Sequence, residues 1–239
     1  MAGTNPAESQ RAATSPPSFQ KGTLSYAITP IKLRSGEDFS AYTDLLIYWS
    51  PVFRTLLESG ARELKLDNKP EVLHNFLHWM YTGIIPDMGR SVYDHGASTL
   101  VRTKSGDLEL AYPERYYKNQ ICAKGVDLYI FATTFQIPKL RNGTLEALDA
   151  WCVGGPYLSY VLVITAYEQL PSSSPLLRWL EDTYALNFTK DGDDTKVETI
   201  LRKKLPNTFL MAVILRKIDN NFMQRAKLSI TDYHERVGN

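Results

Sequence analysis

Two histidines, His74 and His78, stand four residues apart in a segment with helical periodicity. This spacing can place two imidazoles on one face of a helix, where they could bind one metal ion. A metal site needs further ligands, and the other histidines, His95 and His234, are remote in the sequence. Both residues fall beside the apolar stripe of their helix, so we predict that they face solvent or a protein partner. No metal ion is expected.

Asp94, His95 and Ser98 have the side-chain types of an acyl-transfer triad. They are crowded into one glycine-flanked stretch, and the chain has no Gly-x-Ser-x-Gly turn that would expose a serine beside an oxyanion hole. Phosphate-binding glycine loops are absent as well. For Cys122 and Cys152 a buried, unreactive thiol is the simpler interpretation. The sequence therefore predicts no catalytic residue and no cofactor, and a protein that is not an enzyme.

The composition predicts a globular protein in a reducing compartment. An apolar fraction of 44% over 239 residues can supply a core. A formal charge of +1 gives no general attraction to nucleic acid or anionic lipid, so neither is expected as a partner. No apolar run approaches the ~20 residues of a membrane-spanning helix, and the N-terminus lacks the layout of a secretory signal. Two cysteines make no disulfide framework, which favours the cytoplasm or the nucleus.

The elements that would position these residues are clearest between Phe39 and Gly83. Ser50 followed by Pro51 predicts a helix start, and Gly60 predicts its end. Alternating polar and apolar residues predict a half-buried strand, and apolar residues at helical spacing predict the helices around it. The expected order is a helix at 44–49, a helix at 51–60, a strand at 63–67 and a helix at 70–83.

This stretch resembles the BTB/POZ domain. The family shows an apolar entry, a Leu-Leu pair, Ser-Pro-x-Phe, an acidic-flanked strand and a helix that closes on Tyr-Thr-Gly. The matching positions are Phe39, Ala41, Tyr42, Thr43, Leu45, Leu46, Ser50, Pro51, Phe53, the strand from Glu63, and Tyr81-Thr82-Gly83. Tyr42 and Thr43 replace the usual histidine and lysine of the entry, as in a divergent branch. The chain is similar to fungal proteins that consist of a BTB domain and a helical tail.

A second block, from Leu128 to Leu140, resembles the second helical hairpin of the same family. Here we expect one helix from Val126 to Phe135 and, after Ile137-Pro138, another that reaches Trp151. Together the two blocks cover residues 24–152. The resemblance implies an α+β, mostly helical fold, in which a small sheet caps a cluster of helices.

The remaining segments suggest four further parts of the chain. Residues 1–22 are rich in Ser, Thr, Ala and Pro, and we expect a disordered tail. Residues 86–123 are interrupted by Gly and Pro and are interpreted as an insertion with a hairpin at 99–112. Apolar periodicity from 153 to 218 predicts a helical extension, and 219–239 is expected to be a tail.

The resemblance suggests where a partner would dock. In the family the helix at 44–49 lies at a homodimer interface, and helical geometry directs Ile47 outward with Tyr48 on its flank. The strand-like residues from Tyr26 to Leu33, the turn at Ser35-Gly36 and the return from Phe39 resemble the entry hairpin of the family. We expect Ile47, Tyr48 and residues of this entry hairpin to bury themselves against a second copy. The alternative is that the C-terminal helices of the same chain cover them.

A second family role is to recruit a cullin scaffold of a ubiquitin ligase. Members that do so resemble one another in a large-apolar-x-Glu step, which here is Ala61-Arg62-Glu63. The step keeps the carboxylate of Glu63 but replaces the anchoring side chain by the methyl group of Ala61, which weakens the expectation of cullin binding.

The sequence thus predicts a non-enzymatic protein-interaction module that self-associates or holds a partner. One alternative is a substrate adaptor for a cullin-type ubiquitin ligase. Another is a transcription-associated regulator without its own DNA-binding domain, because no paired Cys-x-x-Cys and His-x-x-x-His set of a zinc finger is present.

Overall fold

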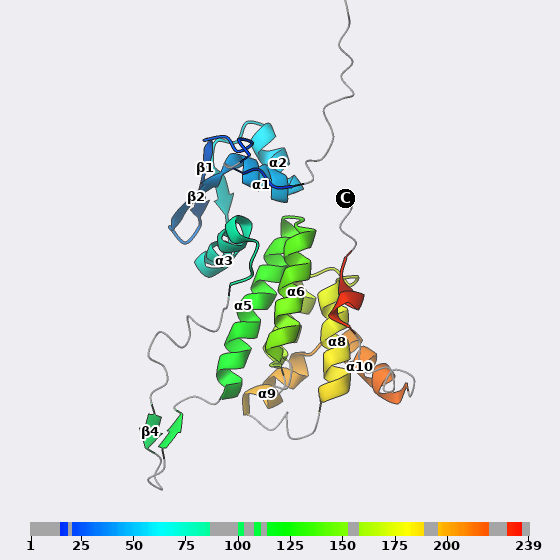
Figure 1. Cartoon of the computed structure of the whole chain (residues 1–239). Helices are drawn as coiled ribbons and strands as arrows, with labels where there is room; N and C mark the ends of the chain where they lie inside the picture. Colours follow the sequence, from blue (N-terminus) through cyan, green and yellow to red (C-terminus); the bar gives the residue numbers. More distant parts are fainter. Residues whose placement is uncertain are drawn as a thin grey trace, which may run out of the picture. The chain divides into compact units, whose positions relative to one another are not determined.

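The computed structural model (Figure 1) describes residues 15–18, 21–86, 100–102, 108–110, 114–152, 158–188, 196–219 and 229–235. Side chains are described for these ranges except at 100–102, 108–110, 114–118, 152 and 196–197. Much of the expected N-terminal tail, Asp94, His95 and Ser98, and most of the expected C-terminal tail therefore lie outside the described residues, as does the side chain of Cys152.

The chain divides into two compact units. One, which we call the N-terminal unit, contains the chain up to Lys69 together with Phe135–Ile137. The other, the helical unit, contains Pro70–Thr134 and Pro138–Glu235. The predicted domain at 24–152 takes residues from both, and its extent stays a prediction.

The N-terminal unit contains a three-stranded sheet in the order β2-β1-β3. β1 (Ile28–Leu33) pairs antiparallel with β2 (Asp38–Tyr42) and parallel with β3 (Leu64–Leu66). In β1 exposed and buried residues alternate strictly, so one face of the strand packs on the core and the other faces outward. The turn between β1 and β2 contains Gly36 at φ 104, a conformation that side chains resist.

Two short helices complete this unit, α1 (Thr43–Trp49) and α2 (Pro51–Glu58). Ser50 caps α2 as predicted, because its hydroxyl oxygen accepts a hydrogen bond from the backbone N–H of Phe53 at 3.1 Å. The same hydroxyl donates to the carbonyl of Phe135 at 2.6 Å. The ring of Phe53 is fully buried and stacks on Phe135 with 4.5 Å between centroids. Residues 135–137 thus complete the core of the N-terminal unit.

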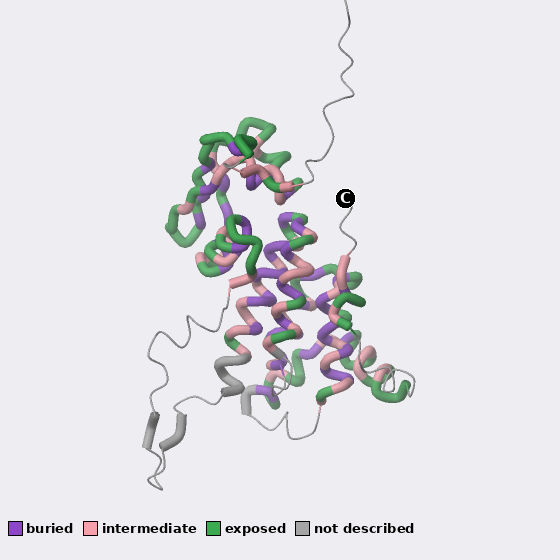
Figure 2. Tube along the Cα trace, viewed as in Figure 1, coloured by how far each residue is buried: buried purple, intermediate pink, exposed green. Residues whose placement is uncertain are grey.

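The helical unit is built on α5 (Glu114–Thr134) and α6 (Pro138–Cys152). α3 (Pro70–Thr82) packs on α5, where Phe76 and Phe131 lie 4.9 Å apart between ring centroids. The remaining elements are α7 (Tyr160–Gln169), α8 (Pro175–Asn187), α9 (Lys196–Leu201), α10 (Asn207–Ile218) and the 3-10 turns η3 (Arg202–Lys204) and η4 (Ile230–Tyr233). Buried side chains of α7, α8, α10 and η4 form one cluster with those of α5 and α6. Figure 2 colours the buried positions along these helices purple.

The start of α5 differs from the expected Val126. α5 begins at Glu114, inside the predicted insertion, and Cys122 on its early turns is buried. Gly125, directly before the expected start, lies within the helix. A Cβ at this position would stand 2.6 Å from Cδ2 of Leu148, so the glycine allows α5 and α6 to approach closely. The predicted hairpin in this region is present as β4 (Leu100–Arg102) and β5 (Leu108–Leu110).

The fold class is confirmed as α+β and mostly helical with a small three-stranded sheet. Within the ranges described above, no helix combines the length and the apolar character needed to cross a membrane.

Candidate functional site

The predicted interface residues of α1 are partly exposed. Ile47 and Tyr48 are each half-buried, and the ring edge of Tyr48 contacts Trp49 at 4.7 Å between centroids. Leu45 and Leu46 are the buried residues of this helix, and Trp49, which the helical spacing groups with them, is half-buried. α1 therefore presents part of an apolar and an aromatic side chain outside the core of its unit.

The start of β1 adds two strongly exposed side chains. Tyr26 is 85% exposed and Ile28 is 59% exposed. The backbone holds this segment to the beginning of α1, because the N–H of Thr43 donates to the carbonyl of Ala27 at 3.0 Å. We call the set Tyr26, Ile28, Ile47 and Tyr48 the entry surface.

The step Ala61-Arg62-Glu63 lies on the surface of the same unit. Ala61 is exposed, and the carboxylate of Glu63 pairs with Lys32 at 3.0 Å and with Lys65 at 3.1 Å. The hydrogen bond from Lys32, and after it the one from Lys65, lowers the pKa of the Glu63 carboxyl. The bond between Lys32 and Glu63 also raises the pKa of Lys32. A partner that uses this carboxylate must compete with two lysines of the chain itself.

His74 and His78 are both exposed on α3. Among the residues with described side chains, no group of three or more His, Cys, Asp or Glu is arranged to hold a metal ion. The two histidines are thus available to solvent or to a partner.

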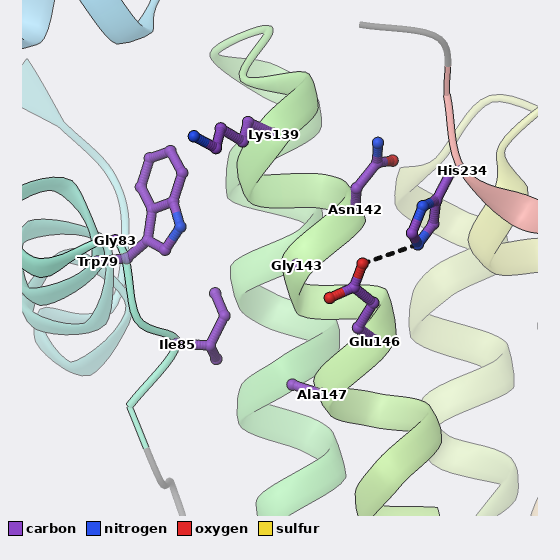
Figure 3. Close-up of a pocket in the computed structure, with 9 residues that line it drawn as sticks. All are labelled: Trp79, Gly83, Ile85, Lys139, Asn142, Gly143, Glu146, Ala147 and His234. Carbon is purple, nitrogen blue, oxygen red and sulfur yellow. Dashed lines mark ion pairs between the residues drawn. The ribbon is translucent and has the colours of Figure 1, made fainter. Parts of the chain in front are cut away.

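A cavity of about 560 Å³ lies within the helical unit (Figure 3). One face of α6 lines it with residues at helical spacing. The remaining walls come from the end of α3 with the residues that follow it, and from residues 229–235, which we call the C-terminal segment. The lining residues are Trp79, Gly83, Ile85, Lys139, Asn142, Gly143, Glu146, Ala147 and His234. They include no hydroxyl or thiol group. Lys139, Asn142 and Glu146 make the cavity suited to holding a polar or charged group of a ligand, with Trp79 and Ile85 on the opposite side (Figure 3).

The C-terminal segment is tied to α6 beside this cavity. The side-chain amide of Asn142 donates to the carbonyl of Glu235 and accepts from its N–H, each at 3.0 Å. Arg141 forms an ion pair with the Glu235 carboxylate. His234 Nε2 lies 3.1 Å from Glu146 Oε1, the pair marked in Figure 3. These contacts hold His234 against α6, where it forms one wall of the cavity.

Sequence reasoning did not find this cavity. Lys139, Asn142 and Glu146 follow the i, i+3, i+7 pattern of one polar helix face, which could have been read from the sequence. His234 gave no such signal, because its segment has no continuous period and was expected to be a tail.

A buried carboxylate connects the C-terminal segment to α8 and α10. Asp182 accepts a hydrogen bond from the hydroxyl of Tyr233 at 2.7 Å and another from Nε of Arg216. Arg216 also pairs with Glu181 at 2.6 Å. Burial first, and then the hydrogen bond to Asp182, raises the pKa of Tyr233. Burial and a hydrogen bond to Glu181 raise the pKa of Tyr167 in the same way.

The raised pKa of Tyr233 predicts a loss of stability at alkaline pH. The folded state holds the phenolic proton to higher pH than the unfolded chain, whose tyrosine has the ordinary pKa of 10.0. The protonated hydroxyl of Tyr233 therefore makes its full contribution to the free energy of unfolding below about pH 10, and this contribution declines as the pH rises further. We expect Tyr233→Phe to make the free energy of unfolding fall less steeply above about pH 10 than in the wild type. Urea denaturation at a series of pH values measures this slope.

Tyr26→Phe is the matched control, because Tyr26 is 85% exposed. Equal slopes for Tyr233→Phe and the wild type would show that the buried hydroxyl does not hold its proton in the folded state.

Comparison with protein families matches the part of the chain that contains the entry surface. Residues 24–96 match the family model described as BTB/POZ domain, a range that begins before β1 and includes the whole of α3. No curated protein matches the chain. The block at 128–140 lies beyond the matched range, so its resemblance to the second helical hairpin of the family stays a prediction. The chain therefore carries a BTB/POZ domain, a protein–protein interaction module, at residues 24–96.

Proposed function

We propose that this BTB/POZ domain associates with a second copy of the chain through the entry surface. The observation that carries the proposal is the exposure of Ile28, of which 59% is accessible on the outward face of β1. Outward strand positions on a solvated sheet are usually polar. An isoleucine that is more than half exposed in this place stabilises a complex when a partner covers it, because apolar surface leaves water. Tyr26, two residues earlier, extends the same apolar segment.

Two further observations support a protein partner at this surface. Ile47 and Tyr48 on α1 retain partly exposed apolar and aromatic area. β2 forms one edge of the described sheet, so its outer backbone groups can pair with an added strand. Tyrosine is also among the residue types that contribute most to interfaces.

Ile28→Asp and Ile47→Asp should each shift the chain toward monomer. Burial of an isoleucine contributes about 1.5–3 kcal/mol, and a carboxylate in its place would lie in an apolar interface. Light scattering with size-exclusion chromatography measures the mass of the wild type and of each variant.

Leu56→Asp serves as the control, because Leu56 is an exposed apolar residue of the same unit outside the entry surface. It should keep the mass of the wild type. A wild type and variants that all have the monomer mass at about 100 µM, a concentration that detects even weak pairs, would end the proposal.

The adaptor role is our second candidate, and Glu63 is the observation that favours it. Its side chain is 36% exposed and stands at the position of the family's large-apolar-x-Glu step. The exposed Ala61 offers only a methyl group as an anchor, and two lysines already pair with Glu63. A pull-down with a purified cullin N-terminal domain tests this role, and the absence of a complex at about 10 µM would remove it.

The regulator role and the setting in the cytoplasm or nucleus remain proposals from the sequence. Neither rests on an observed contact. Affinity purification of the full chain with mass spectrometry of bound proteins would test both together.

A further inference from the structure

α10 is apolar around most of its circumference, and its own unit covers only one side. On that side Phe209 is 2% exposed, with its ring edge against Tyr184 at 5.1 Å and Tyr167 at 5.8 Å between centroids. Val213 packs against the same cluster, and Arg216 pairs with Glu181 and Asp182 of α8. This side anchors α10 to the helical unit.

The opposite side of α10 is apolar and exposed. Each residue of a helix advances by about 100°, so positions separated by one, four, five and eight residues fall in one arc. We call this arc the α10 outer face, and its members are Leu210, Met211, Ile214, Leu215 and Ile218, with exposed fractions of 37%, 56%, 53%, 55% and 69%. The arc contains no charged residue. A helix that is apolar all round is expected to be buried on all sides.

We propose that the α10 outer face pairs antiparallel with the same face of a second copy of this chain. Leu210, Ile214 and Ile218 form one ridge at four-residue spacing, and Met211 and Leu215 form a second ridge beside it. Two such helices can interdigitate ridge into groove, which is the commonest packing class in globular proteins. A two-fold axis makes the face its own complement, because each copy supplies the same ridges and the same groove.

The charges at the two ends of α10 select the antiparallel orientation. Lys203 and Lys204 are exposed in η3, two residues before α10 begins at Asn207. Asp219 is the C-cap of α10, where the negative end of the helix dipole lies. Antiparallel pairing brings the lysines of one copy toward the C-terminal end of the other. Parallel pairing would bring the lysines of both copies together.

Basic residues also lie in the last turn of α10, and both are engaged within the chain. Arg216 lies on the covered side, between Glu181 and Asp182. Lys217 donates to the carbonyl of Phe188 at 3.1 Å and lies over the Phe188 ring. These contacts direct the two side chains toward α8 and its C-cap and not toward the outer face.

A lipid surface is the competing occupant, since lysines beside an apolar helix face also suit anionic membranes. Trp, Phe and Leu are typical of the apolar face of helices that lie in the membrane interface, and of these three the outer face contains only leucine. Isoleucine and leucine in two ridges are instead typical of helix pairing. The observations therefore favour a second copy.

The size of the face predicts weak pairing. Five side chains of one helix bury less than the ~800 Å² per partner of a standard stable interface. We therefore expect dissociation in the micromolar range. The α10 outer face and the entry surface share no residue, so the two proposals can be tested separately.

Sedimentation equilibrium of the full chain tests the pairing. The experiment is run in a background of Ile28→Asp and Ile47→Asp, so that failure of the entry-surface proposal does not affect the outcome. We expect this background to self-associate as its concentration rises to about 200 µM, and Ile214→Glu with Leu215→Glu to weaken that association at least tenfold. Val161→Glu is the matched control, because Val161 is 44% exposed on α7, and it should leave the association unchanged.

Cross-linking supplies a second measurement, which does not require a charged residue to be introduced into the α10 outer face. Ile214 lies near the middle of the arc, so Ile214→Cys should form an intermolecular disulfide on mild oxidation with diamide, and Val161→Cys should not. Equal cross-linking of the two variants, or a background that stays monomeric at all concentrations, would overturn the proposal. Binding of the background to vesicles of phosphatidylserine, lost in Ile214→Glu with Leu215→Glu and without any self-association, would overturn it in favour of lipid.

Discussion

Phe53→Ala is expected to lower the free energy of unfolding by about 3–5 kcal/mol, the typical range for truncation of a fully buried phenylalanine. Phe53 is 0% exposed in the core of the N-terminal unit. Its ring stacks on Phe135, and the two rings are inclined by 26°. The variant loses the transfer free energy of the ring and leaves a cavity, because the capped helix around it cannot collapse fully. Urea denaturation measures the change.

Leu56→Ala provides the control on the same helix, because Leu56 is 41% exposed. It should cost less than about 1 kcal/mol. A double-mutant cycle with Phe135→Leu isolates the stacking of the two rings, and we expect a coupling of about 0.5–1.5 kcal/mol. A coupling near zero would contradict the assignment of Phe135 to the core of the N-terminal unit.

Much of the N-terminal unit could be predicted because its signals are local. The cap at Ser50, the proline that follows it, and the alternation from Glu63 to Asp67 each act over a few residues. The structure places α2 and β3 where these signals indicated. The contact of Ser50 with Phe135 was not predictable, because nothing in either segment specifies a partner far away in the chain.

The helical unit was harder to predict for a different physical reason. A glycine within a helical pattern can mark either a break or a close approach, and only the position of Leu148 decides this at Gly125. The sequence of α10 is almost wholly apolar up to Arg216. Its periodicity could not tell which side packs on α8 and which side stays exposed, since both sides are apolar.

The candidate site shows the same limit. His74 and His78 are exposed on a helix whose pattern already indicated an outward position for them. The cavity along α6 depends on the C-terminal segment, which returns to α6 through Asn142 and Glu146. These contacts join polar residues far apart in the chain, and polar periodicity does not encode such pairings.

Asp182→Ala is the second change with a large expected effect, about 3 kcal/mol of unfolding free energy. Asp182 is 6% exposed on the buried face of α8, where an acidic residue is stable only when it is fully hydrogen-bonded. Its removal leaves the hydroxyl of Tyr233 without its acceptor. Arg216 keeps Glu181, which limits the cost. Denaturant unfolding measures the loss, and Asp182→Asn should cost less because it keeps an acceptor in place.

A cycle with Tyr233→Phe separates the hydrogen bond from the packing of the C-terminal segment. If Asp182 stabilises the protein through Tyr233, then Tyr233→Phe should cost less in the Asp182→Ala background than in the wild type, by about 1 kcal/mol or more. Additive costs would mean that Asp182 acts mainly through Arg216. Loss of the bond should also loosen η4 and, with it, the His234 wall of the α6 cavity. Hydrogen exchange of the Glu235 amide, which donates to Asn142, should therefore become faster in Asp182→Ala.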